Sequence, residues 1–295
     1  MSSSISKLLI PLHVQYIQSL GESKDDLLYH LTAHLRMNAI YWGLTALNIM
    51  QHKDALSRTE MIDFVVSCWD DEAGAFGAHP DHDAHLHATL SAIQILIMQD
   101  ALDRVDVDRV VKFILSLQQP SGVFAGDQWG EVDTRFLYCA VNALSLLGRL
   151  HELDVEKTVG YLRQCRNFDG GFGAVAGAES HAAMVFVCTA ALAILDRLDE
   201  IDQETLGWWL AERQLPNGGL NGRPEKLEDE TEHGGIADRP GDQPDVFHTH
   251  FGVAGLSLLG YPGLADLDPV YCMPAKIIER MGLRRDWEAL PRKTE

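Results

Sequence analysis

A turn that opens with glycine recurs at a fixed interval along this chain of 295 residues. Gly74 opens Gly-Ala-Phe, Gly122 opens Gly-Val-Phe, Gly170 opens Gly-Gly-Phe and Gly218 opens Gly-Gly-Leu, each 48 residues after the one before. A fixed period of this length predicts a repeat architecture, in which each unit packs against its neighbours. The next match, Gly-Gly-Ile at Gly234, follows after only 16 residues, so the spacing indicates that 32 residues are absent there.

Each glycine turn lies between two helical patterns of different character. Before the second turn, apolar residues between 107 and 114 recur at i, i+3, i+4 and i+7, which predicts an amphipathic outer helix. An aspartate in register precedes this helix in three repeats and predicts an N-cap. These aspartates are Asp106, Asp154 and Asp202. After the turns the pattern is more apolar, and the stretch 182–195 has no charge, which is typical of a buried inner helix.

Stacked hairpins of this kind form either an open solenoid or a closed ring. We expect an all-α fold, an α/α barrel (toroid) of repeated helix hairpins with one hairpin's worth of helix missing. The continuous repeat predicts a single domain over residues 1–295. Residues 218–245 are rich in Gly, Pro, Asp and Glu and predict a long loop where the period is interrupted.

The composition argues against several classes of protein. A net charge of −19 argues against nucleic acid as a partner. No apolar stretch reaches the ~18 residues that a membrane span requires, so we expect no membrane span. The five cysteines are odd in number and widely spaced, which favours reduced thiols in a cytoplasmic protein over a disulfide framework.

The repeat register also aligns polar residues at the starts of the inner helices. His85, Asp133, His181 and Asp229 are each 48 residues apart, and Asp245 follows after 16. We expect all five at one mouth of the barrel, where helix N-termini favour an anion. The alternative is that each residue is simply a helix cap.

Basic residues are scarce in this acidic chain, so their placement is informative. Arg135 follows Asp133 by two residues, and Arg223 and Lys226 follow the fourth glycine turn. Together with His181 they predict a basic cluster suited to a phosphate or diphosphate. The alternative is a solvated loop in which these cations form salt bridges to Glu225 or Asp229.

Two further sets of residues are candidates for the lining of the barrel interior and for a metal site. Aromatic residues near the inner helices line either an apolar cavity or an ordinary core. They are Tyr41, Trp42, Tyr138, Phe186, Phe247 and Phe251. His248, with Asp229 and Asp245 nearby, is a weak indication of a zinc site.

Several longer motifs resemble a known family. Asp-Gly-Gly-Phe-Gly at 169–173, Glu-Ser-His-Ala at 179–182 and Gly-Gly-Leu-Asn-Gly-Arg-Pro-Glu-Lys at 218–226 resemble the β subunits of protein prenyltransferases. Three more motifs are similar to those of the type II, or Rab geranylgeranyltransferase, β subunits. They are Gly-Asp-Gln-Trp-Gly-Glu-Val-Asp-Thr-Arg-Phe at 126–136, Ala-Asp-Arg-Pro-Gly-Asp at 237–242 and Tyr-Cys-Met-Pro at 271–274.

The resemblance implies an α/α barrel that transfers geranylgeranyl from geranylgeranyl diphosphate to the C-terminal cysteines of Rab GTPases. It implies an α subunit as partner and an escort protein that delivers the Rab. The catalytic residues that hold the diphosphate would be His181, Arg223 and Lys226. Arg135, Trp42 and Phe247 would lie beside the lipid.

The resemblance also implies a catalytic zinc ion, bound by an Asp, by a Cys two residues later and by a His. Asp229 and His248 match two of these ligands, but Thr231 stands where the family has Cys. The family continues here into an inner helix and an outer helix that this chain lacks. The departure leaves a second hypothesis, a catalytically impaired scaffold or truncated isoform or gene model that keeps lipid or α-subunit binding. Terpene cyclisation, a third hypothesis, is disfavoured because no Asp-x-Asp-Asp motif is present.

Overall fold

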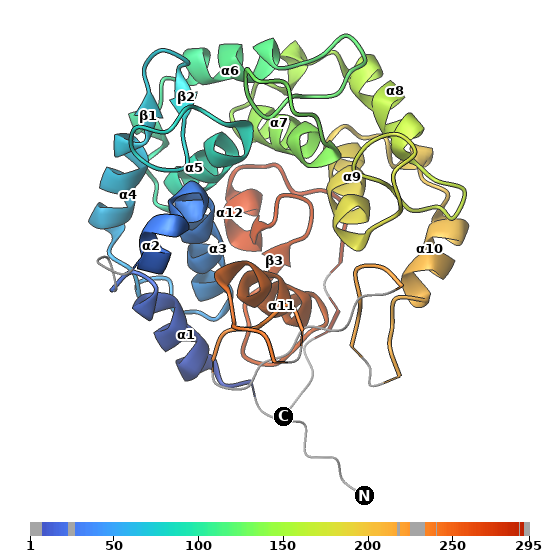
Figure 1. Cartoon of the computed structure of the whole chain (residues 1–295). Helices are drawn as coiled ribbons and strands as arrows, with labels where there is room; N and C mark the ends of the chain where they lie inside the picture. The colour runs from blue at the N-terminus through green and yellow to red at the C-terminus, as the bar shows by residue number, and fades with distance from the viewer. Residues whose placement is uncertain are drawn as a thin grey trace, which may run out of the picture.

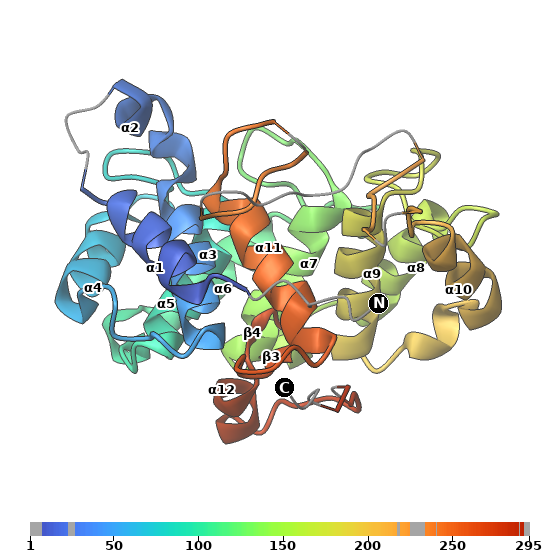
Figure 2. The same ribbon diagram turned by 90° about the horizontal axis from the view of Figure 1, so that it is seen from below.

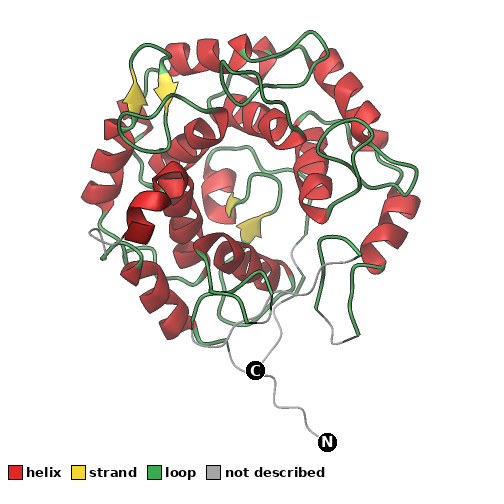
Figure 3. Ribbon diagram, in the orientation of Figure 1, coloured by secondary structure: helices red, strands yellow, loops and turns green. Residues whose placement is uncertain are grey.

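The structure is a computed structural model that describes residues 8–22, 27–216, 219–224, 234–239, 241–288 and 290–291. Its helices form two concentric rings (Figures 1 and 3). The outer ring contains α1 (Ile10–Ser19), α4 (Arg58–Ser67), α6 (Val107–Ser116), α8 (Val155–Cys165) and α10 (Gln203–Ala211). The inner ring contains α3 (Arg36–Ile49), α5 (Leu86–Met98), α7 (Thr134–Leu146), α9 (Ala182–Ile194) and α11 (Val246–Leu258). The predicted all-α toroid is therefore confirmed.

The remaining elements are short. Two helices, α2 (Leu27–Leu31) and α12 (Ala275–Arg280), belong to neither ring. Two small antiparallel sheets pair β1 (Trp69–Asp70) with β2 (Ala75–Phe76) and β3 (Leu267–Asp268) with β4 (Met273–Pro274). Among the described residues, four 3-10 turns occupy Ala33–Leu35, Leu102–Arg104, Leu150–Glu152 and Leu198–Glu200.

Side-chain caps begin the outer helices where the sequence predicts them. Asp106 accepts a hydrogen bond from the Arg109 N–H at 3.2 Å, and Asp154 accepts one from the Lys157 N–H at 3.2 Å. Asp202 caps α10 in the same way. These bonds satisfy N–H groups that have no partner within the helix, so they define where each helix starts.

The inner helices pack side by side around most of the ring, in the order α11, α3, α5, α7 and α9. Between α9 and α11 the described backbone has no packing contact of comparable extent. Phe186 on α9 and Phe251 on α11 approach each other there, with ring centroids 6.1 Å apart. We call this place, where α9 is followed by α11, the seam. In the outer ring, no helix of the described residues lies between α10 and α1 (Figure 1).

A loop around β3, β4 and α12 lies inside the ring in Figure 1 and at one end of it in Figure 2. Inner helices hold this loop by buried hydrogen bonds. The Tyr271 carbonyl accepts the Gln94 amide at 3.1 Å, and the Tyr271 hydroxyl lies 2.8 Å from Ser145 Oγ. Tyr138 donates its hydroxyl to the Val270 carbonyl at 2.9 Å. The loop therefore forms a floor at the mouth opposite the inner-helix N-termini.

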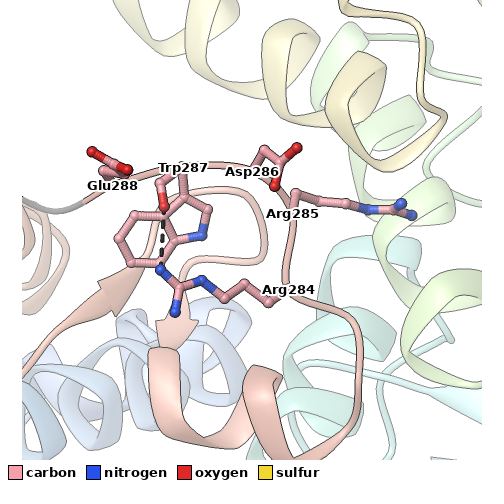
Figure 4. A pocket seen from close by; sticks show the side chains of 5 residues that line it. All are labelled: Arg284, Arg285, Asp286, Trp287 and Glu288. Carbon is pink, nitrogen blue, oxygen red and sulfur yellow. Dashed lines mark hydrogen bonds between the residues drawn. The ribbon is translucent and has the colours of Figure 1, made fainter.

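The C-terminal segment (residues 284–288) crosses this floor and borders a cavity of about 580 Å³ (Figure 4). Arg285 binds the end of α9, with 2.8 Å from Nη2 to the Ile194 carbonyl and 2.8 Å from Nη1 to Asp196 Oδ1. Trp287 donates its indole N–H to the buried Asp268 at 2.9 Å. Further on, the carbonyls of Leu290 and Pro291 lie against Gly260, just past the end of α11. The chain end thus connects the two sides of the seam.

No helix occurs in the described parts of 218–245, which agrees with the predicted loop. Whether residues 1–295 form a single domain stays a prediction. Among the helices that the structure describes, none has the length and apolar character to cross a membrane.

Candidate functional site

Four inner helices begin with a capping side chain at the same mouth of the toroid, at the top in Figure 2. His85 and His181 each accept a backbone N–H at Nδ1, at 3.1 Å. Asp133 accepts the Arg135 N–H at 2.7 Å, and Asp245 accepts the His248 N–H at 2.8 Å. The predicted positions of these four residues are confirmed. Asp229 lies outside the described residues.

The first N–H of α5, α7 and α9 donates to a carbonyl in the glycine loop of the following repeat. Leu86 donates to the Gly126 carbonyl at 2.7 Å, and Ala182 donates to the Gly222 carbonyl at 2.9 Å. The same bond joins Thr134 to the Ala174 carbonyl. Residues that are distant in sequence therefore meet at the mouth because each loop caps the previous inner helix.

The hydrogen bond to Gly222 brings the loop that carries Arg223 beside His181. The Nδ1 atom of His181 accepts the Ala183 N–H, so its Nε2 carries the proton and is a donor. The Arg223 guanidinium lies 3.5 Å from the Glu179 carboxylate. Its Nε is buried and has no hydrogen-bond partner in the part of the chain that the structure describes. The His181 ring and the loop that carries Arg223 therefore meet at a helix N-terminus, an arrangement that suits an anionic ligand.

The other two predicted members of the basic cluster are Lys226 and Arg135. Lys226 lies outside the described residues. Arg135 forms a two-pronged ion pair with Asp133, with 2.9 Å from Nε to Oδ1 and 2.9 Å from Nη2 to Oδ2. The hydrogen bond to Asp133 raises the pKa of Arg135, although burial opposes it. Arg135 is thus at the mouth, but its charge is largely neutralised by the carboxylate of Asp133, which caps the same helix.

Aromatic side chains extend from the mouth across four inner helices. Trp42 on α3 and Phe247 on α11 are 5.0 Å apart between ring centroids, and Phe247 and Phe251 are 4.8 Å apart. Across the seam, Phe251 meets Phe186, which lies 5.5 Å from Tyr138. We call these five residues the aromatic belt. Because Phe186 is five residues beyond His181, it lies about 7.5 Å further along α9. An apolar chain attached to an anion at the mouth would meet the belt.

His248 lies between two carboxylates. Its Nδ1 is 2.6 Å from Asp245 Oδ2, and its Nε2 is 3.4 Å from Asp238 Oδ1. Burial raises the pKa of Asp245, but the hydrogen bonds from the His248 ring and backbone outweigh burial and leave it below its usual value. Sequence reasoning placed Asp245 near His248 but missed Asp238. The repeat register could have located Asp238 at the mouth, because it stands four residues after Gly234, as Gly222 stands four residues after Gly218.

The described residues do not fit the zinc ion that the family resemblance implies. They contain no group of three or more His, Cys, Asp or Glu side chains that could hold a metal ion. Zinc favours thiolate ligands, but all five cysteines are buried. Burial raises the pKa of Cys139 and of Cys272 to about 12, so both remain protonated thiols. Asp229 and Thr231, the other positions of the expected ligand set, lie outside the described residues.

A second feature of the mouth was not predicted. A pocket of about 490 Å³ opens between α3, α5 and the loops before them. Its lining includes His34, His82, His85, His87 and Asp127. Burial lowers the pKa of His87 to about 4, with smaller effects from its charged neighbours. The pocket adjoins the aromatic belt through His87, whose ring is 6.3 Å from Trp42.

The chain matches the family model of the prenyltransferase alpha-alpha toroid domain over residues 8–231 and again over 229–273. This chain belongs to that family. The two matched stretches meet at residues 229–231, which is where the glycine spacing predicts that helices are absent.

The curated relatives agree with the narrower resemblance. The chain is 48% identical to the geranylgeranyl transferase type-2 subunit beta of Saccharomyces cerevisiae over 319 residues, which cover 95% of this chain and 98% of that protein. It is 42% identical to the type-2 subunit beta 1 of Arabidopsis thaliana, over 95% of this chain and 97% of the relative. The predicted membership among type-2 β subunits is therefore confirmed. The yeast alignment is longer than this chain, so that relative has residues with no counterpart here.

The fold has a close counterpart among solved structures. The Candida albicans protein geranylgeranyltransferase-I complexed with GGPP superposes with a TM-score of 0.83. The match covers 95% of this chain and 100% of that chain at 19% identity. At this identity the likeness supports the toroid fold, and the ligand belongs to that protein.

Proposed function

We propose that this chain is the β subunit of a type II protein geranylgeranyltransferase, which transfers geranylgeranyl from geranylgeranyl diphosphate to C-terminal cysteines of Rab GTPases. The observation that carries the proposal is that Gly222 lies against the His181 ring, which brings the loop with Arg223 to the N-terminus of α9 beside the aromatic belt. The donors at the helix N-terminus suit the diphosphate, and the aromatic belt suits the isoprenoid chain. The relatives are named as β subunits, which supports an α subunit as partner. The Rab, its escort protein and a cytoplasmic location are further parts of the proposal.

In this function the two donors act on the leaving group. The bond between C1 of the lipid and the diphosphate oxygen breaks as the cysteine sulfur bonds to C1, and the thiol proton passes to solvent. Negative charge then grows on the diphosphate. Arg223 and the Nε2 proton of His181 stabilise that charge because both are already oriented before the reaction. The aromatic belt excludes water from the isoprenoid and holds it in place.

A zinc ion would lower the pKa of the acceptor thiol in this family's chemistry. No step here depends on it, because the described residues do not form a zinc site. Zinc dependence is therefore a separate proposal. Metal content of the purified protein, measured beside activity, would address it.

A specific observation favours a second function. The seam lacks the packing that joins the other inner helices, and it lies beside His181 and Phe186. The second proposal is a scaffold that binds the α subunit or the lipid without efficient transfer.

The test is prenyl transfer by this chain, purified with its α subunit, with a Rab substrate and the escort protein. We expect transfer that falls at least tenfold in Arg223→Ala and in His181→Ala. The control Arg280→Ala removes an exposed arginine next to the floor and should leave the rate unchanged. If the wild-type complex binds the lipid diphosphate but transfers nothing, the scaffold function holds instead.

A further inference from the structure

The repeat register shows which side chains the seam leaves uncovered. On α10, Leu210 is 43% exposed. Its counterparts at the same position of the two preceding repeats are Ile114 on α6 and Leu162 on α8, which are 0% and 1% exposed. All three are branched aliphatic residues at the same register position of an outer helix, so the difference in exposure comes from what covers each helix. A position that is buried on α6 and α8 is open to solvent at the seam.

The turn after α10 gives the same result independently. Leu220 is 61% exposed, whereas Phe124 and Phe172, 96 and 48 residues earlier in register, are 0% and 1% exposed. All three follow a glycine turn and form the same isolated bridge to the end of the preceding outer helix. The local backbone structure is therefore the same in all three turns, but the side chain of Leu220 is not covered as those of Phe124 and Phe172 are.

The opposite side of the seam is also partly uncovered. Leu256 on α11 is only partly buried. Leu144 on α7 and Leu192 on α9, which occupy the same register position, are 0% and 1% exposed. Apolar side chains on both sides of the seam thus lack the contacts that their equivalents have.

We propose that the seam is a docking site for a helix hairpin supplied by another polypeptide. The hairpin would consist of an apolar inner helix between α9 and α11 and an amphipathic outer helix between α10 and α1. The proposal rests on the repeat geometry and not on the proposed function.

We infer a helix hairpin as the occupant because it would continue the helix–helix packing of both the inner and the outer ring. Around the rest of the ring, each inner helix packs against the next, and outer helices stand behind them. A hairpin at the seam would continue both interfaces and would cover Leu210 and Leu220. The alignment with the yeast relative is longer than this chain, so that relative carries residues with no counterpart here, and those at the break in the glycine spacing can serve as a probe.

The test is binding of that probe to the full-length chain. A labelled synthetic peptide would carry the residues of the Saccharomyces cerevisiae relative that align with the gap after residue 229. Fluorescence anisotropy should show saturable binding of one peptide per chain. Leu210→Asp and Leu220→Asp should each weaken it at least tenfold. Trp208→Asp is the matched control, because Trp208 lies on α10, is 70% exposed, and is in register with the exposed Lys112 of α6. It should change the affinity less than twofold.

Equal effects of Leu210→Asp and Trp208→Asp would overturn the proposal. A wild-type dimer in light scattering that Leu210→Asp dissociates would also overturn it, because the occupant would then be a second copy. A second measurement covers a peptide that does not fold alone: the same residues inserted after position 229 should slow amide hydrogen exchange in α10. Unchanged exchange in the inserted variant would contradict the proposal. None of these readouts requires catalysis, so they remain informative if the proposed function fails.

Discussion

Gly222 lies directly against the imidazole of His181. A Cβ atom built on Gly222 would be 2.8 Å from Cε1 and 2.9 Å from Nε2 of that ring. The loop cannot retreat easily, because the Gly222 carbonyl accepts the Ala182 N–H at the start of α9. The glycine therefore sets how closely Arg223 and His181 approach each other.

We predict that Gly222→Ala weakens binding of geranylgeranyl diphosphate about tenfold. The new methyl group must displace either the imidazole or the loop, and a displacement of this size removes one charge-assisted hydrogen bond, worth about 1.5–3 kcal/mol. Titration of a fluorescent lipid diphosphate measures the effect. Gly160→Ala is the control, since a Cβ there meets nothing within 4 Å. It should leave affinity unchanged and stabilise α8 by about 0.5–1 kcal/mol. Wild-type affinity in Gly222→Ala would show that the contact is irrelevant to binding.

The register pairing of Leu162 with Leu210 gives a stability prediction. Leu162→Ala removes a fully buried side chain and should cost about 2–5 kcal/mol of unfolding free energy. Leu210→Ala should cost less than about 1 kcal/mol, because the side chain is already 43% exposed. Urea unfolding of the two variants measures the difference. Similar losses would mean that Leu210 is covered in solution.

Buried histidine predicts a particular pH dependence. His250 is fully buried, its Nε2 lies 3.3 Å from Cys272 Sγ, and burial lowers its pKa to about 3. The unfolded chain therefore binds a proton that the folded chain does not, between the ordinary pKa of 6.5 and about 3. Unfolding free energy should fall as pH decreases from 6.5, by up to about 1.4 kcal/mol per pH unit from this group.

His250→Leu should remove that contribution and flatten the curve below pH 6.5, as measured by denaturation at a series of pH values. His151→Leu, at an exposed histidine, is the control and should leave the slope unchanged. An unaltered slope in His250→Leu would contradict the assignment. Burial also lowers the pKa values of His13, His85 and His87, and these histidines would contribute to the slope that remains below pH 6.5.

The aromatic belt predicts a loss of lipid affinity that does not depend on charge. Phe247 is 39% exposed, so Phe247→Ala should fold normally while removing contact with Trp42 and Phe251. Affinity for geranylgeraniol, which has no phosphate, and for the diphosphate should fall by the same factor. Phe168→Ala, at a fully exposed aromatic residue, should change neither. A loss confined to the diphosphate would remove Phe247 from the lipid site.

Much of the fold could be predicted because its determinants are local and repeated. Asp106 and Asp154 cap helices through backbone groups three residues away, so a single sequence shows them. The positions of His85 and His181 follow from the same period. The pairing of Arg135 with Asp133 was not predicted, although the two residues are only two apart, because an ion pair and a ligand contact require the same residue types.

The contacts that the chain end makes across the seam could not be predicted for a different reason. Arg285 and Trp287 belong to no repeat, and their partners, Asp196 and Asp268, lie 89 and 19 residues away. Pairings of this kind depend on where the chain end is placed by the whole fold. The contact between Asp238 and His248 is an intermediate case, because the register could have located Asp238 but gives no orientation for its side chain.

The measurement that tests the account most directly compares two ligands on two proteins. Dissociation constants for geranylgeranyl diphosphate and for geranylgeraniol are measured on the wild-type chain and on Arg223→Ala. The account predicts that the variant loses diphosphate affinity by about 10-fold to 100-fold, as expected for a charge-assisted hydrogen bond, and keeps its affinity for the alcohol. Equal diphosphate affinity in the two proteins, or equal losses for both ligands, would contradict an anion site formed by Arg223 and His181.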